Sequence, residues 1–224
     1  MSEHPGTQKH QDIAGALFII DLARCTGCHA CAVACKDRGA SGVLGRDASL
    51  LDDVDMLWVR SEERGQYAQP DGEPLEVIFR PVHCWHCQDA DVAANGCATI
   101  CPVEAIRAES DGHWRIDLDT CVRCGACAEV CPFEAIDQLA DGTPVVCDGC
   151  VDELARGWEP TCVRACPMRA LAYHSYDGVG YSGAGHSATV PSAEEYAGRE
   201  PDKTWDAHDL RPRVVYLKRR KESQ

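Results

Sequence analysis

Long apolar runs are absent from this chain of 224 residues. The longest, IAGALFII at 13–20, is strand-sized, whereas a membrane-spanning helix needs about eighteen residues or more. The N-terminus, MSEHPGTQKHQDIAGA, also lacks the charged, apolar and small-residue order of a cleavable export signal. We therefore expect no membrane span and no export signal. The chain is either cytoplasmic or exported as the passenger of a signal-bearing partner, which would also supply any membrane association.

Large apolar side chains and positive charge are both scarce. The chain has only three Phe and three Met, which are few for the hydrophobic core of a protein of this size. We therefore expect groups bound by cysteine to cross-link the interior. The net charge is -14, from 22 Lys and Arg against 36 Asp and Glu, which disfavours nucleic acid and anionic membranes as main partners. The one basic stretch, RPRVVYLKRRK at 211–221, is interpreted as a solvated end or as a docking strip for an acidic partner.

Sixteen cysteines, in contrast, are abundant, and they fall into four groups of four with none left over. An even number suits a disulfide framework in an exported protein. Here, however, neighbouring cysteines lie so close in sequence that their sulfurs point into one small volume, which favours a shared metal centre. The groups are Cys25, Cys28, Cys31 and Cys35; Cys84, Cys87, Cys97 and Cys101; Cys121, Cys124, Cys127 and Cys131; and Cys147, Cys150, Cys162 and Cys166.

The spacing within the groups indicates iron-sulfur clusters. Groups one and three are C-x2-C-x2-C-x3-C, a run whose fourth cysteine ligates the other cluster of a two-cluster module. Structural zinc instead takes pairs of CxxC knuckles, whereas every group here ends in CxxxC and three are followed by proline. Groups two and four keep this ending although nine and eleven residues separate their second and third cysteines. We expect 4Fe-4S clusters, with zinc as the minor alternative, and a surface loop at 88–96.

An internal repeat follows three of the groups. The segments are PVEAIRAESDGHWRIDLDTC after Cys101, PFEAIDQLADGTPVVCDGC after Cys131 and PMRALAYHS after Cys166. In the first two, an Asp-Gly turn at 111–112 and at 141–142 predicts a β-hairpin. Small hairpins that alternate with cluster loops and short helical turns are typical of ferredoxin modules, so we expect an α+β fold with two fused modules.

Two regions lie outside the cysteine repeats. Residues 36–83 contain no cysteine, and DMLWVR and PLEVIFRPV predict two strands that flank a polar connection, SEERGQYAQPDGE. We interpret this β-rich region as an insertion at a subunit surface. From residue 174 to 224 the sequence has little periodicity, which predicts an extended tail that is wrapped or partly disordered.

With four groups in this order and CPMRAL closing the last, residues 15–173 resemble the electron-transfer beta subunit of the dimethyl sulfoxide reductase family of molybdopterin oxidoreductases. The resemblance implies two nested ferredoxin-like modules, the outer from 1–35 and 147–173 and the inner from 84–146. It also implies a non-catalytic subunit that relays single electrons through four 4Fe-4S clusters. Its partners would be a molybdopterin-containing catalytic subunit and a redox partner, with or without a quinone-reactive membrane subunit.

The same resemblance implies how the cysteines are shared. Each cluster takes three cysteines from one group and the last cysteine of another. The sets are Cys25, Cys28, Cys31 and Cys166 (cluster 1); Cys147, Cys150, Cys162 and Cys35 (cluster 2); Cys121, Cys124, Cys127 and Cys101 (cluster 3); and Cys84, Cys87, Cys97 and Cys131 (cluster 4). Nitrate-reductase-like relatives have Trp at the position of Cys124 and a 3Fe-4S centre, so cysteine here predicts 4Fe-4S. Clusters 1 and 2 would lie nearest the catalytic subunit and cluster 4 farthest from it.

Charged and imidazole side chains near the cysteines have subsidiary roles in this interpretation. Lys36, Arg123 and Arg164 put positive charge near clusters, where it would tune their potentials, or face solvent. His29, His83 and His86 could replace a ligand, but sixteen cysteines already fill sixteen positions, so surface or hydrogen-bonding roles are expected.

A stand-alone soluble polyferredoxin that binds its partners transiently is the alternative function. The insertion and the tail favour a permanent subunit, because they offer surface that a mobile carrier would not need.

Overall fold

The computed structural model describes residues 18–39, 54–65, 75–88, 96–174, 202 and 213–218. Within these ranges the chain forms one three-stranded sheet, three two-stranded hairpins and four short helices. The mixed α and β character predicted from the sequence is confirmed. None of the described helices is long and apolar enough to cross a membrane. The expected surface loop at 88–96 and the N-terminal segment fall almost entirely outside the described residues.

The three-stranded sheet joins the two ends of the chain. Its central strand, β1 (Phe18–Asp21), pairs antiparallel with β8 (Leu171–Tyr173) and parallel with β9 (Val214–Leu217). All residues of the three strands are buried. The interpretation of 211–221 as a solvated end is therefore wrong for its four central residues, because VVYL supplies a strand of the core. The rest of the tail, apart from Asp202, Arg213 and Lys218, lies outside the described residues.

The two hairpins predicted from the Asp-Gly turns are confirmed. Strand β4 (Ile106–Ala108) pairs with β5 (Trp114–Ile116), and β6 (Ile136–Gln138) pairs with β7 (Pro144–Val146), both antiparallel. Gly112 and Gly142 have φ of 83° and 80°, a conformation that glycine adopts at little steric cost. The two turns are thus built alike, as the repeat in the sequence requires.

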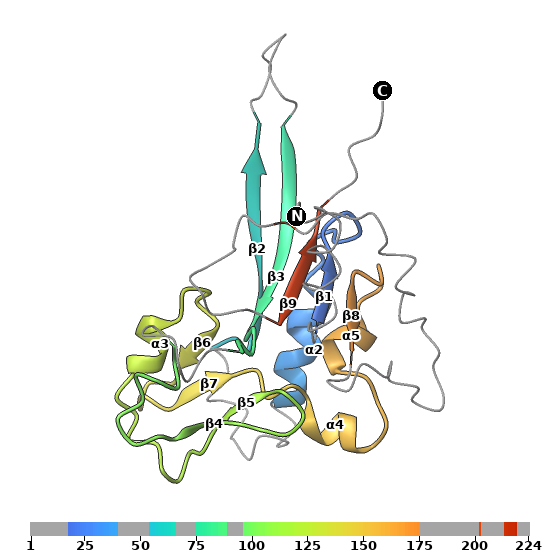
Figure 1. The fold of residues 1–224 in the computed structure, drawn as a ribbon. Helices are drawn as coiled ribbons and strands as arrows, with labels where there is room; N and C mark the ends of the chain where they lie inside the picture. The colour runs from blue at the N-terminus through green and yellow to red at the C-terminus, as the bar shows by residue number, and fades with distance from the viewer. Residues whose placement is uncertain are drawn as a thin grey trace, which may run out of the picture.

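The cysteine-free region forms a longer hairpin, β2 (Leu57–Arg64) with β3 (Glu76–His83). The two strands are confirmed, but β2 continues to Arg64, so the connection that was predicted to begin at Ser61 begins later. The base of the hairpin is not a surface decoration. Met56 and Leu57, at the start of β2, belong to the same buried cluster as Phe18 of β1. This region is therefore part of the core at one end and a projection at the other (Figure 1).

Each described helix contains or directly adjoins cysteines of the predicted groups. The helices are α2 (Ala30–Arg38), α3 (Ala126–Val130), α4 (Val151–Ala155) and α5 (Thr161–Ala165). Helix α2 packs against α5, and α3 packs against β6. In Figure 1 the first and last cysteine groups consequently lie together beside the three-stranded sheet, α3 lies at the lower left, and the β4–β5 hairpin reaches from there toward α4.

Candidate iron-sulfur sites

The first pair of cysteines in each group encloses the same backbone turn. The residue before the second cysteine has a positive φ in all four groups: Gly27 69°, His86 44°, Arg123 58° and Gly149 72°. This turn directs that residue's N–H at the first cysteine, with Arg123 N to Cys121 Sγ at 3.4 Å and Gly149 N to Cys147 Sγ at 3.5 Å. Gly27 and His86 donate to Cys25 and Cys84 in the same way. A positive φ is uncommon outside glycine, so its fourfold recurrence marks these loops as one repeated device.

The later cysteines also receive backbone hydrogen bonds. Ala105 N–H donates to Cys101 Sγ and Ala170 N–H to Cys166 Sγ, each at 3.2 Å. The third cysteine of each group accepts from the residue that follows it, namely Ala32, Ala98, Ala128 and Val163. Hydrogen bonds to the charged form of a group favour that form, and hydrogen bonds to cluster sulfurs help to set reduction potentials. These loops are therefore built to hold thiolates.

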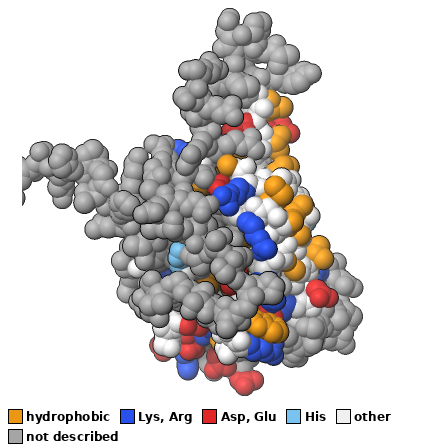
Figure 2. Space-filling model, turned by 90° about the vertical axis from the view of Figure 1, so that its right-hand side faces the viewer, with side chains coloured by type: hydrophobic (Ala, Val, Ile, Leu, Met, Phe, Trp, Pro, Cys, Tyr) orange, Lys and Arg blue, Asp and Glu red, His pale blue; other side chains and the backbone are white. Residues whose placement is uncertain are grey.

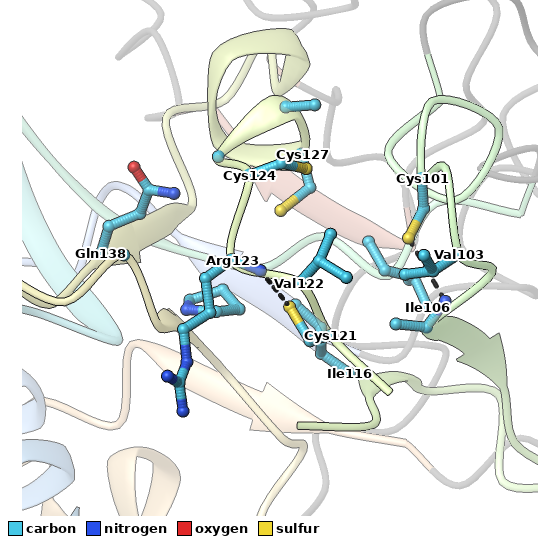
Figure 3. Close-up of a pocket in the computed structure, with 15 residues that line it drawn as sticks. Cys101, Val103, Ile106, Ile116, Cys121, Val122, Arg123, Cys124, Cys127 and Gln138 are labelled. Carbon is cyan, nitrogen blue, oxygen red and sulfur yellow. Dashed lines mark hydrogen bonds between the residues drawn. The ribbon is translucent and has the colours of Figure 1, made fainter. Parts of the chain in front are cut away.

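Four thiols of the predicted cluster 3 surround one pocket (Figure 3). Cys121, Cys124 and Cys127 come from one loop, and Cys101 comes from the end of the preceding group. The remaining lining is mostly apolar and includes Val103 and Ile106. A second pocket is lined by the four thiols of the predicted cluster 1, Cys25, Cys28, Cys31 and Cys166, together with Val59 and Met168.

In each of the other two sets, the cysteines lie close enough to raise the pKa of one another. Burial raises the pKa of Cys147 well above its usual range, and the neighbouring Cys150, Cys35 and Cys162 raise it further. Burial likewise raises the pKa of Cys84, with further contributions from Cys97, Cys87 and Cys131. Cys35 itself, buried and beside Cys150, has a pKa raised to about 12. Such thiols stay protonated at neutral pH unless a positive centre compensates their charge, and the iron of a cluster would supply that compensation.

The donor set therefore fits 4Fe-4S clusters. All sixteen cysteines are free thiols, so the disulfide framework is not formed. Over the described ranges, no three Cys, His, Asp or Glu side chains are grouped so that they could hold a single metal ion. Eight of the thiols instead line the two wider pockets described above.

The cysteines differ in how far their side chains are exposed to solvent. Only Cys28 and Cys124 are exposed, and they occupy the same second position in groups one and three. Cys150, the second cysteine of group four, is buried. The predicted clusters 1 and 3 thus have one ligand at the surface.

The buried positive charge beside the cysteines comes from Arg38, which the sequence did not single out. Its side chain donates to both carboxylate oxygens of Asp148 at 3.0 Å and also to Asp152. This charge opposes the rise in pKa of Cys35 and Cys150. The only hint in the sequence was its place one turn after Cys35 in a helix.

The three cations predicted to tune the clusters make ion pairs nearer the surface. Lys36 pairs with Asp55 at 3.3 Å, Arg123 with Asp141 at 3.9 Å, and Arg164 with Glu153. Their side chains are all more than a third exposed. Solvent therefore screens their charges more than that of Arg38.

Two of the predicted histidines are buried. His83 Nδ1–H donates to Cys84 O at 2.8 Å, and His86 Nδ1 accepts from Trp114 N–H at 3.1 Å. Burial lowers the pKa of both, to about 4 for His83. The hydrogen-bonding role is confirmed and the surface position is wrong for these two, whereas His29 is exposed. A further buried histidine, His113, was missed altogether.

Comparison with known proteins agrees with this chemistry. A model of the 4Fe-4S dicluster domain matches residues 75–175, and a model of a 4Fe-4S binding domain matches residues 22–38. These matches confirm 4Fe-4S as the cofactor class in place of zinc.

Three relatives illustrate the similarity. The B subunit of anaerobic dimethyl sulfoxide reductase from Escherichia coli (strain K12) is 31% identical over 164 residues, which cover 71% of this chain and 73% of that protein. The corresponding subunit of Haemophilus influenzae is 32% identical over 71% of this chain and 74% of its own length. The formate dehydrogenase-O iron-sulfur subunit of Escherichia coli is 32% identical, over 69% of this chain and 51% of its own length.

Proposed function

Because this protein belongs to the family of iron-sulfur electron-transfer subunits that contains the B subunit of dimethyl sulfoxide reductase, we propose that it relays single electrons for a molybdopterin-containing catalytic subunit. It would do so through four 4Fe-4S clusters and bind no substrate itself. The fourfold repeat of thiols that accept backbone N–H groups carries this proposal. A scaffold for electron transfer has only to hold the clusters close, exclude water and set potentials.

The proposed ligand sets are the four given by the family resemblance. Two pockets, each lined by one complete set, support clusters 1 and 3. The mutual effects on thiol pKa support clusters 2 and 4. The packing of α2 against α5 and the pairing of β1 with β8 support the nested arrangement, because both contacts join residues before 39 to residues after 160.

Burial supports one order of the clusters. Trp85 and His86, between the first two cysteines of cluster 4, are buried, and Trp85 stacks on Phe133 at 3.7 Å and also contacts Tyr216 of β9. Cluster 3, in contrast, has Cys124 at the surface. These contacts support cluster 3 as the end of the series of clusters, in place of cluster 4 as expected from the sequence. The proposed order is then cluster 1, cluster 2, cluster 4 and cluster 3.

Both ends of this order carry apolar surface. Exposed Val122 lines the pocket of cluster 3, and exposed Met168 lines that of cluster 1. On the side of the molecule that carries α5 and β8, hydrophobic side chains form a band along one edge, with Lys and Arg side chains beside it (Figure 2). Apolar residues and arginine are common in protein interfaces. These features support a permanent subunit with one partner at each end.

Purification of the native complex tests the function. We expect a molybdenum-containing chain to copurify at a one-to-one ratio, with about sixteen iron atoms per copy of this chain, four for each cubane. A chain that emerges alone with its clusters intact would instead be a stand-alone carrier. Zinc without iron or labile sulfide would contradict the cluster assignment itself.

A further inference from the structure

His113 lies between two cysteine loops that belong to different proposed modules. Its side chain is fully buried. The ring is 4.6 Å from that of His86, in the loop from Cys84 to Cys87, and packs edge to face on it. On the other side, a Cβ added to Gly149 would lie 2.2 Å from Cδ2 of His113, so the ring rests directly on the loop from Cys147 to Cys150.

The next residue, Trp114, is the first of β5 and is bound to one of these loops. Trp114 N–H donates to His86 Nδ1 at 3.1 Å, and its indole N–H donates to Cys87 O at 2.7 Å. Gly149, which the imidazole covers, donates its own N–H to Cys147 Sγ at 3.5 Å. The start of β5 therefore contacts one loop through hydrogen bonds and the other through the packed ring of His113.

The internal repeat shows that the turn itself does not need histidine. Thr143 occupies the equivalent position in the second hairpin and is also buried. Its N–H bonds to Asp141 Oδ1 at 2.9 Å, as His113 N–H bonds to Asp111 Oδ1 at 3.0 Å. The ring of His113 has Asp111 Oδ1 3.3 Å from Nδ1, and within the described residues Nε2 has no hydrogen-bond partner. Because Thr143 serves the same turn, the turn accounts for the backbone of His113 but does not require an imidazole.

We propose that His113 is a positioning residue for the electron step between the two modules, from cluster 2 to cluster 4 or in reverse. This inference rests on the proposed function and ligand sets. With clusters held by the two ligand sets, one electron would pass from one cluster to the other, oxidising the first and reducing the second, and no atom or proton would be transferred. The buried ring of His113 fixes the separation of the two loops and lies between them. Its fixed dipole in a low-dielectric interior also biases the potentials of the two clusters.

The test compares His113→Ala and His113→Phe with the matched control Thr143→Ala in the intact complex. For each variant, three quantities are measured. They are the iron content, the cluster potentials from an EPR-monitored redox titration, and the rate of electron transfer between clusters 2 and 4. We expect His113→Ala to keep its iron but to slow electron transfer between clusters 2 and 4, because the loops that the ring holds apart can shift and the ring itself is lost. The redox equilibrium between clusters 2 and 4 should change by about tenfold, which is about 59 mV for one electron. His113→Phe, which refills the space, should recover most of the rate, and Thr143→Ala should change neither quantity.

Three results would overturn the inference. The first is a His113→Ala protein with unchanged rate and potentials. The second is a change confined to clusters 1 and 3. The third is loss of iron from all four clusters in both His113 variants, which would assign the side chain to folding alone. A wild-type complex without four clusters, or without a catalytic partner, would be a failure of the proposed function instead.

Discussion

A buried ion-pair network that joins the β2–β3 hairpin to the C-terminal region offers a quantitative test of the fold. The guanidinium of Arg80 is fully buried, and it donates to Asp202 Oδ2 at 3.0 Å and to Glu62 Oε1 at 2.9 Å. Its Cζ also lies 4.5 Å from the ring centroid of Tyr216 in β9. Asp202, whose side chain is 1% exposed, donates its own N–H to Tyr216 O at 2.6 Å. Asp202 is therefore the link between the hairpin and the last strand.

We expect Asp202→Asn to destabilise the protein by about 3 kcal/mol. Removing one partner of a buried ion pair costs about 3–5 kcal/mol, and the lower end applies because Glu62 still pairs with Arg80. For a chain of this size, that loss lowers the melting temperature by roughly 6–12 °C. Thermal unfolding of the cluster-loaded protein, followed by circular dichroism and visible absorbance, measures it. Glu63→Gln removes the same charge from an exposed position of β2 and should stay within about 0.5 kcal/mol. Equal melting temperatures for the two variants would refute the reasoning.

The pH dependence of the same variant follows from Glu62, the partner that Arg80 retains. Burial alone would raise the pKa of Glu62, but hydrogen bonds from Arg80 and Arg64 outweigh it and hold the pKa below the usual 4.5. A carboxylate with a lowered folded pKa contributes stability above its unfolded pKa and loses it as the pH falls through the folded value. The free energy of unfolding of Asp202→Asn should therefore lie a constant amount below that of the wild type around neutral pH. It should fall further below about pH 4.5, as Glu62 becomes protonated.

Two further substitutions test the clusters directly. Cys35→Ser should perturb cluster 2, held by Cys147, Cys150 and Cys162, and leave the cluster of its own loop intact; the opposite EPR pattern would contradict the nested ligand sets. Arg38→Gln removes a buried positive charge beside Cys35 and Cys150, so cluster 2 should become harder to reduce; one charge at roughly 8 Å and an effective dielectric constant of about 20 contributes on the order of 2 kcal/mol, or roughly 90 mV for one electron. An unchanged potential in EPR titration would show that the two aspartates already cancel the charge of Arg38.

The parts of the fold that sequence could predict are those specified locally. The Asp-Gly turns determine the two short hairpins, since the turn residues and the strands they join are neighbours in the chain. The C-terminal strand could not be predicted in this way. VVYL is only four residues long and flanked by arginine and lysine, and its apolar character gains meaning only when it pairs with β1, almost two hundred residues earlier. Short strands that depend on distant partners carry little signal of their own.

The same distinction holds for the candidate site. The cysteines were predictable because their spacing is local, whereas Arg38 acts through a carboxylate 110 residues away. His113 acts through loops on both sides of it in the sequence, 86 and 149. Neither could be identified until the chain was folded. The cysteine motif supplies the ligands, whereas residues such as Arg38 and His113 adjust the position and the potential of the site after folding.

The number of residues between the second and third cysteines of each group also agrees with the proposed order of the clusters. Groups one and three, with two residues between their second and third cysteines, are the groups whose second cysteine is exposed. In group four the eleven-residue gap contains α4, and Cys150, which precedes this helix, is buried. In group two the residues inserted at 89–95 lie outside the described ranges, but Trp85 and His86 are buried. Long gaps thus belong to the clusters proposed for the middle, where water must be excluded. Short gaps leave a ligand at the surface, where a partner has to come close enough to exchange an electron.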